Sequence, residues 1–162
     1  MASPFIFEER PHSRHDKGKR MACLGCRLAN GREAIHTVYE DDFVTCLLDH
    51  DPFSEGHTLI IPKRHAVEQE ELDDPLAKAV MEASQIVSRA IKLLYRPDGI
   101  TICQNGGVFN ELTHFHLHVV PRTAERPFSE FWSAARTNPQ SQQLSRTREM
   151  LSSSIAAIIA CQ

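Results

Sequence analysis

The order of elements along this chain of 162 residues predicts an α+β domain built on an antiparallel β-sheet of about five strands. Five short segments are rich in β-branched and apolar residues and are joined mainly by turns, whereas only one long segment has clear helical periodicity. The sequence has no internal repeat and no regular alternation of strand and helix, which argues against a parallel α/β fold. The length suits one domain with a substantial hydrophobic core.

Turn residues bound the predicted strands. Asp41-Asp42 joins the first two strands as a hairpin, residues 52–56 lead into the third strand, and Pro62 ends it. The five strands are expected at residues 37–40, 43–48, 57–61, 100–103 and 114–120.

Residues 75–96 form the long helix that the sequence predicts. Asp73 or Asp74 can cap its N-terminus, Pro75 suits its first turn, and Pro97-Asp98-Gly99 stops it. Its apolar residues recur at helical spacing and form one stripe: Leu76, Val80, Ala83, Val87, Ala90, Ile91 and Leu94. A weaker pattern over residues 143–160 also fits a helix. Residues 1–20, basic and poor in hydrophobic residues, are expected to form a flexible extension.

Charge and composition exclude several classes of protein. The net charge of −3 at pH 7 gives no general basic field, so we expect no stable nucleic-acid partner. No apolar run approaches the length of a membrane span, and the N-terminal residues lack the features of a signal peptide. The five cysteines are odd in number and scattered, which argues against a disulfide scaffold and favours a reducing, cytoplasmic setting.

The most informative motif is a run in which His114, His116 and His118 alternate with apolar residues. Successive side chains of a β-strand point to opposite faces, so the three imidazoles would share one face and the apolar residues would enter the core. Imidazole can act near neutral pH as a nucleophile, a proton carrier or a metal ligand. The strand therefore predicts a site for a substrate or a metal.

Two further segments contain residues that could bind a phosphate or a metal near this strand. The turn Gln104-Asn105-Gly106-Gly107 can offer backbone N–H groups to a phosphate, although Asn-Gly-Gly is also an ordinary turn. Cys23-x-x-Cys26 has the spacing of two thiolate ligands on one metal ion. With no second cysteine pair, the spacing fits a metal site and a chance arrangement equally well.

The segment 39–122 resembles the histidine triad (HIT) superfamily of nucleotide hydrolases and transferases. The resemblance is carried by three stretches: Leu48-Asp49, Pro52-Phe-Ser-Glu-Gly-His57-Thr-Leu-Ile-Ile-Pro-Lys-Arg-His65 and His114-Phe-His116-Leu-His118-Val-Val. It implies a HIT domain at residues 21–125, followed by a C-terminal helical extension at 126–162. It also implies a homodimer, because the family pairs protomers by sheet extension and helix contact.

The resemblance implies catalytic roles for three histidines. His116 matches the nucleophile that attacks the α-phosphorus of a nucleotide, and His118 and His57 match donors that hold the phosphate. The expected reaction is cleavage of a nucleoside phosphoramidate or a dinucleoside polyphosphate through a nucleotidyl-histidine intermediate.

Further matched positions concern nucleotide binding. Asp49 matches an acidic residue that accepts from the ribose hydroxyls, and Asn105 matches an asparagine that supports one of the histidines. Phe43 and Leu48 are expected to help form the base pocket.

The resemblance also suggests a metal. In many bacterial members two cysteines, the histidine after Pro-Lys-x and the first triad histidine bind one zinc, and these positions are Cys23, Cys26, His65 and His114. A Cys₂His₂ set closes a tetrahedron, which is typical of structural zinc.

The segment before the triad departs from the family pattern. Many relatives have Gly-Gln-Ser or Gly-Gln-Thr, where this chain has Phe109-Asn110-Glu111-Leu112-Thr113. Asn110 can still donate a hydrogen bond to the nucleotide, with a shorter reach, and Glu111 would place negative charge near a phosphate. Both residues therefore bear on the choice of leaving group.

Two other classes of function remain open at this point. In one, the three histidines of the strand hold a catalytic metal with a further ligand and water. In the other, the protein is a nucleotide-binding adaptor with little turnover, which a blocking Glu111 would favour.

Overall fold

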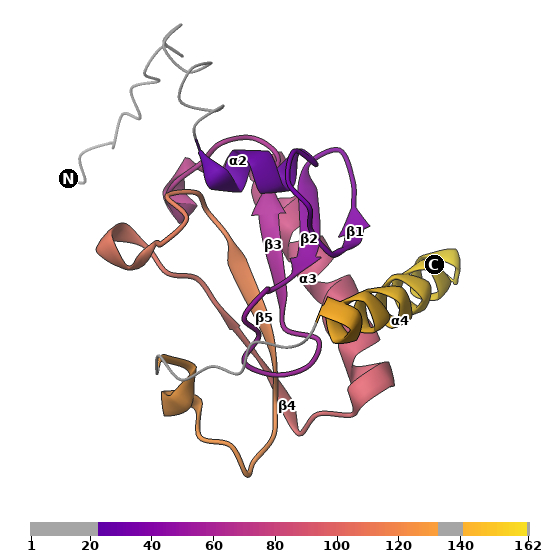
Figure 1. Cartoon of the computed structure of the whole chain (residues 1–162). Coiled ribbons are helices and arrows are strands. Elements are labelled where there is room, and N and C mark those ends of the chain that lie inside the picture. Colours follow the sequence, from indigo (N-terminus) through magenta and orange to yellow (C-terminus); the bar gives the residue numbers. More distant parts are fainter. Residues whose placement is uncertain (1–22, 133–140, 162) are drawn as a thin grey trace, which may run out of the picture.

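The computed structural model describes residues 23–132 and 141–161. The extension predicted for residues 1–20 lies outside the described residues. Figure 1 shows a single sheet with helices packed against it.

The described strands form one five-stranded antiparallel sheet, in the order β1-β2-β3-β5-β4. The predicted fold class is therefore confirmed. The strands are β1 (Thr37–Glu40), β2 (Val44–Leu48), β3 (Thr58–Pro62), β4 (Gly99–Cys103) and β5 (Leu117–Arg122).

The strand that carries the histidines is shorter than the sequence predicts. Regular pairing begins at Leu117, so His114 and His116 precede β5. The cause is a change of partner: the N–H of Phe115 donates to the carbonyl of Ala66 (2.6 Å), in the loop that follows β3. Because the backbone leaves the sheet here, the ring of His114 points toward α2 and its cysteines.

The long helix α3 (Asp74–Tyr95) confirms the predicted helix. Asp73 caps it by accepting from the N–H of Leu76 (3.1 Å), with Pro75 in the first turn. The other helices are α2 (Leu24–Ala29) and α4 (Ser141–Ala160), with short 3₁₀ helices η1 (Gln69–Glu71), η2 (Gly107–Phe109) and η3 (Phe128–Trp132). In the described part of the chain, no helix combines the length and apolarity that a bilayer span requires.

Both faces of the central strands are buried, because helices cover each of them. Cys46 and Ile60 face α3, which in turn packs against α4, and α4 also contacts β1 (Figure 1). Leu47 and Leu59 face the opposite side, where α2 and Leu112 complete a smaller cluster. The candidate functional residues lie on this second side.

Candidate active site and metal centre

Asp49, His57 and His118 form a buried chain of polar side chains. Nε2 of His57 lies 3.0 Å from Nδ1 of His118, and Nδ1 of His57 lies 3.5 Å from Oδ2 of Asp49. The N–H of Phe53 donates to Nδ1 of His57 (3.2 Å), so His57 carries its proton on Nε2 and donates it to His118. His118 then keeps its own proton on Nε2, and this N–H is a hydrogen-bond donor at the site.

His116 is held in the opposite tautomer. Its Nδ1 lies 2.9 Å from the backbone carbonyl of His114. A carbonyl oxygen only accepts, so Nδ1 must carry the proton and Nε2 must carry a lone pair. The ring centroids of His116 and His118 are 4.8 Å apart, and the His116 side chain is buried. The start of β5 and the residue before it thus offer a nucleophilic nitrogen beside a hydrogen-bond donor.

Both rings open onto a pocket of about 840 Å³. Its apolar wall comes mainly from α2, β2 and β3: Leu24, Leu28, Ile35, Leu47, Leu48 and Leu59. The volume falls within the range of small-molecule sites, which are typically apolar with a few converging polar groups.

The strand register spreads the polar residues along this pocket. Asp49 follows the last residue of β2, at the level where β3 begins. His118 pairs with Leu59 one step further along β3. His116 precedes the first residue of β5, which pairs with Ile60. The pocket therefore has an Asp49 end and a His116 end, with His118 between them.

The structure brings most of the predicted nucleotide-binding residues to this pocket, but not Phe43 or Asn110. Asp49, Leu48 and Asn105 line it. Phe43 is 46% exposed and precedes β2 at the strand end remote from Leu48. Five residues of extended chain span about 17 Å, which places the phenyl ring outside the pocket.

The contacts of Asn110 and Asn105 differ from those that the sequence analysis predicts. Asn110 is buried and points its amide at the carbonyl of Val67 (3.0 Å), so it anchors a loop and does not line the pocket. Among the printed contacts of the described residues, the Asn105 side chain has no hydrogen bond to a histidine; the backbone carbonyl of Asn105 accepts from Gln104 (2.6 Å).

The candidate metal ligands converge at a second place. Nδ1 of His114 lies 3.5 Å from the sulfurs of both Cys23 and Cys26. Nδ1 of His65 lies 3.3 Å from the sulfur of Cys26 and from Nδ1 of His114. The four ligand atoms all lie within 4.8 Å of one another.

These separations fit a tetrahedral zinc ion. Bonds of about 2.3 Å to sulfur and 2.0–2.1 Å to nitrogen place neighbouring ligand atoms about 3.3–3.8 Å apart, with the two sulfurs at the upper end of this range. Nε2 of His114 donates to the carbonyl of Pro62 (2.9 Å), which leaves the Nδ1 lone pair facing the cysteines. Burial lowers the pKa of His114 to about 4, so the ring is neutral, as a ligand must be.

A glycine makes room for this cluster. A Cβ atom on Gly25 would lie 2.3 Å from Cβ of His114, closer than any side chain permits. The position between the two cysteines in α2 therefore excludes even alanine. The absence of a side chain at Gly25 lets α2 pack directly against His114.

The same geometry separates His114 from the other two triad residues. Its ring contacts the cysteines and Pro62, whereas His116 and His118 face the pocket. The three imidazoles thus do not converge on one catalytic metal. Asp49, His57 and His118 do bring ligand atoms within 4.8 Å of one another and form a second cluster of candidate metal ligands.

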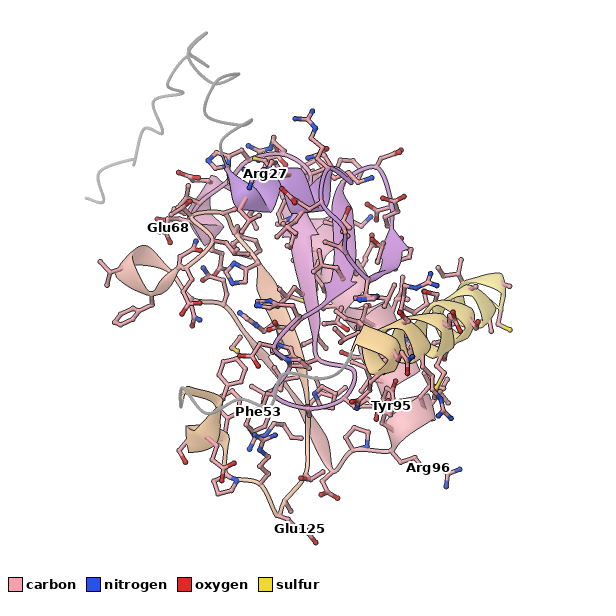
Figure 2. All side chains as sticks on the ribbon, viewed as in Figure 1. Arg27, Phe53, Glu68, Tyr95, Arg96 and Glu125 are labelled. Carbon is pink, nitrogen blue, oxygen red and sulfur yellow. The ribbon has the colours of Figure 1, made fainter. Side chains whose placement is uncertain are left out.

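Phe131 is a site residue that the sequence reasoning missed. Its ring is 1% exposed and lies 5.6 Å from the ring of His118 and 5.8 Å from that of His57. The η3 helix holds it there, with Phe131 packed on Phe128 and on Phe53, of which Figure 2 labels Phe53. The extension after the domain therefore supplies one wall of the pocket.

We expect Phe131→Ala to shift the ring ¹⁵N resonances of His57 and His118 and to destabilise the protein by about 3–5 kcal/mol. Phe128→Ala, in the same helix but only partly buried, is the matched control and should perturb both properties less. Histidine NMR spectra and urea unfolding measure the two effects. Equal effects of the two variants would show that Phe131 does not support the histidines.

Comparisons with known proteins agree with this arrangement. The family model described as "HIT domain" matches residues 31–125. "Protein hit" of Bacillus subtilis is 32% identical over 141 residues, covering 85% of this chain and 94% of that protein. "Adenylylsulfatase HINT3" of Arabidopsis thaliana is 33% identical over 102 residues, covering 62% of this chain and 52% of that protein.

A solved structure is also similar to this chain. A Zn-bound histidine triad family protein from Mycobacterium smegmatis superposes with a TM-score of 0.74 and 28% identity, covering 88% of this chain and 99% of that one. Sequence match, sheet topology and the paired histidine and cysteine sites lead to one conclusion: this chain belongs to the HIT family.

Proposed function

We propose that the protein is a nucleotide hydrolase or nucleotidyl transferase that cleaves at the α-phosphate through a covalent intermediate on His116. The observation that carries this proposal is the hydrogen bond from Nδ1 of His116 to the His114 carbonyl, which fixes a lone pair on Nε2 beside the pocket. A neutral imidazole with a fixed tautomer is a competent nucleophile at neutral pH.

In the first step, Nε2 of His116 attacks the α-phosphorus, forming an N–P bond as the bond from phosphorus to the leaving group breaks. The N–H of His118 donates to the phosphate oxygens or to the departing atom, where negative charge develops. The hydrogen bond from Nε2 of His57 to Nδ1 of His118 keeps the proton of His118 on its Nε2, where this N–H can donate to the phosphate. In the second step, water attacks the phosphorus, breaks the N–P bond and releases a nucleoside monophosphate.

The nucleotide lies along the pocket in this proposal. The ribose binds at the Asp49 end, and the base packs against the apolar wall that includes Leu28 and Leu47. The phosphate lies between His57, His116 and His118. The proposed zinc at Cys23, Cys26, His65 and His114 is structural, because its four protein ligands leave no position for substrate.

A crystal soaked with AMP or GMP tests this placement. We expect the phosphorus within about 3–3.5 Å of Nε2 of His116, the range of a near-attack geometry. The ribose hydroxyls should lie within hydrogen-bond distance of Asp49. Nucleotide bound elsewhere, or none at millimolar concentration, would contradict the placement.

The reaction itself is tested by a chromatographic screen for released nucleoside monophosphate. Phosphoramidates, dinucleoside polyphosphates and aminoacyl-adenylates form the panel, with adenylyl sulfate added because a relative is named adenylylsulfatase. We expect turnover of at least one class. Nucleotide binding without turnover of any substrate class would favour the alternative of a nucleotide-binding adaptor with little turnover.

A homodimer is part of the proposal. Strand β4 is an outer strand of the sheet, with Ile102 46% exposed, so its free edge can pair with a second copy. We expect light scattering to give twice the chain mass of 18.3 kDa at micromolar concentration. Ile102→Lys should weaken the dimer, whereas Ile159→Lys on α4 should not. A mass of one chain for the unmodified protein would refute the dimer.

A further inference from the structure

We propose that Glu111 selects the leaving group by charge, so that the enzyme favours cationic amines and rejects anionic groups such as pyrophosphate or sulfate. The inference rests on the proposed function and specifies the substrate class of the same site. Its basis is the position of one carboxylate that has no ion pair with any described residue, in a pocket whose described lining holds no lysine or arginine.

A short turn fixes the position of Glu111. The N–H of Thr113 donates to the carbonyl of Asn110 (3.3 Å), so Glu111 and Leu112 occupy the tip. Asn110 is tied to the carbonyl of Val67, and Leu112 packs into the cluster beneath α2. With both neighbours anchored, the backbone of Glu111 is held at the pocket that this residue lines.

This turn lies at the His116 end of the pocket. The chain between Asn110 and Phe115 runs beside residues 66–67, beyond the end of β3, as the hydrogen bonds to Val67 and Ala66 show. Asp49 lies at the opposite end, where β3 begins. With the ribose at the Asp49 end and the phosphorus at the histidines, the leaving group extends toward Glu111.

The other acidic residues of the pocket have different surroundings. Glu33 is paired with Arg27 (2.6 Å), in the region that Figure 2 labels at the α2 side of the molecule. Asp49 lies 3.5 Å from both His57 and His50. Asp51 belongs to the ribose end, two residues after Asp49 and bound to it through its N–H (3.0 Å).

Glu111 itself is exposed and has no hydrogen bond or ion pair among the described residues. Its charge is therefore not offset by a neighbouring side chain. A polyphosphate or sulfate leaving group would gain negative charge close to this carboxylate as the bond to phosphorus breaks. An ammonium group on the leaving amine would instead be attracted. At a solvent-exposed position close to the reacting groups, one such charge changes a rate by about tenfold.

Three adenosine phosphoramidates test this inference. Their leaving amines have equal length and end in an ammonium, a methyl or a carboxylate group. We expect kcat/KM to fall in that order for the unmodified protein, by about tenfold at each step. Glu111→Gln should bring the three values together, and Glu111→Asp, which keeps the charge, should preserve the order.

Glu125→Gln is the matched control. It removes one carboxylate on the loop after β5, labelled in Figure 2, at a residue that does not line the pocket, and should leave all three values and their order unchanged. Equal values for the three substrates in the unmodified protein would overturn the inference. An order that survives in Glu111→Gln would overturn it as well.

The proposed function fails in a different way in the same experiment. If it is wrong, none of the three substrates is hydrolysed, or His116→Ala hydrolyses them as fast as the unmodified protein, and the inference about Glu111 falls with it. If only the inference is wrong, all three are hydrolysed in a His116-dependent manner but the charge of residue 111 has no influence.

Discussion

His116→Ala is expected to lower the release of nucleoside monophosphate by about 10⁴-fold or more, the scale seen when a covalent nucleophile is removed. The physical reason concerns the described residues that line the His116 end of the pocket. Among them, His116 alone holds a nitrogen lone pair in a fixed position. Initial rates under saturating and limiting substrate, measured by chromatography, give the loss in kcat and in kcat/KM.

Metal content serves as the control for this variant. His116 lies in neither cluster of possible metal ligands, so the variant should bind as much zinc as the unmodified protein. His118→Ala tests the alternative of a catalytic metal held by Asp49, His57 and His118. Two zinc ions per chain in the unmodified protein, falling to one in His118→Ala, would favour that alternative. Near-normal turnover by His116→Ala would rule out His116 as the nucleophile.

The second large effect concerns zinc. Cys26→Ser should lose the bound ion and lower the melting temperature by about 10 °C, since the loss of a metal ligand in a buried cluster typically costs several kcal/mol. Cys26 is 5% exposed and its sulfur contacts both histidines of the cluster. Elemental analysis of protein purified without chelator and thermal unfolding measure the two effects.

Cys161→Ser is the matched control, because Cys161 is exposed at the end of the described chain and lies outside the cluster. It should retain one zinc per chain and an unchanged melting temperature. Absence of zinc from the unmodified protein under reducing conditions would contradict the site. A Cys26→Ser protein that keeps its metal would do the same.

The regular elements could be predicted because their signals are local. Alternating apolar residues and bounding turns define the strands, and Asp73 with Pro75 marks the start of α3. The resemblance to a family, carried by the run of three histidines and the segment that ends at His65, implied which residues converge in the metal cluster. Those residues come from segments far apart in the sequence, and periodicity alone would not have joined them.

Most of the differences between prediction and structure depend on contacts between distant segments. Asn110 turns away from the pocket because the carbonyl of Val67 accepts its amide. Phe131 reaches the histidines because η3 folds back onto Phe53. Phe43 has the expected residue type, but the length of β2 separates it from the pocket. No local pattern in the sequence encodes these contacts.

The most direct test of the central claim is to trap the intermediate. An adenosine phosphoramidate is mixed with enzyme in excess, the reaction is quenched in alkali, where a phosphorus–imidazole bond survives, and the digested protein is examined by mass spectrometry. The account predicts one added nucleoside monophosphate on the peptide that contains His116, absent from the His116→Ala protein. Turnover without any protein-bound nucleotide, or nucleotide on another residue, would contradict it.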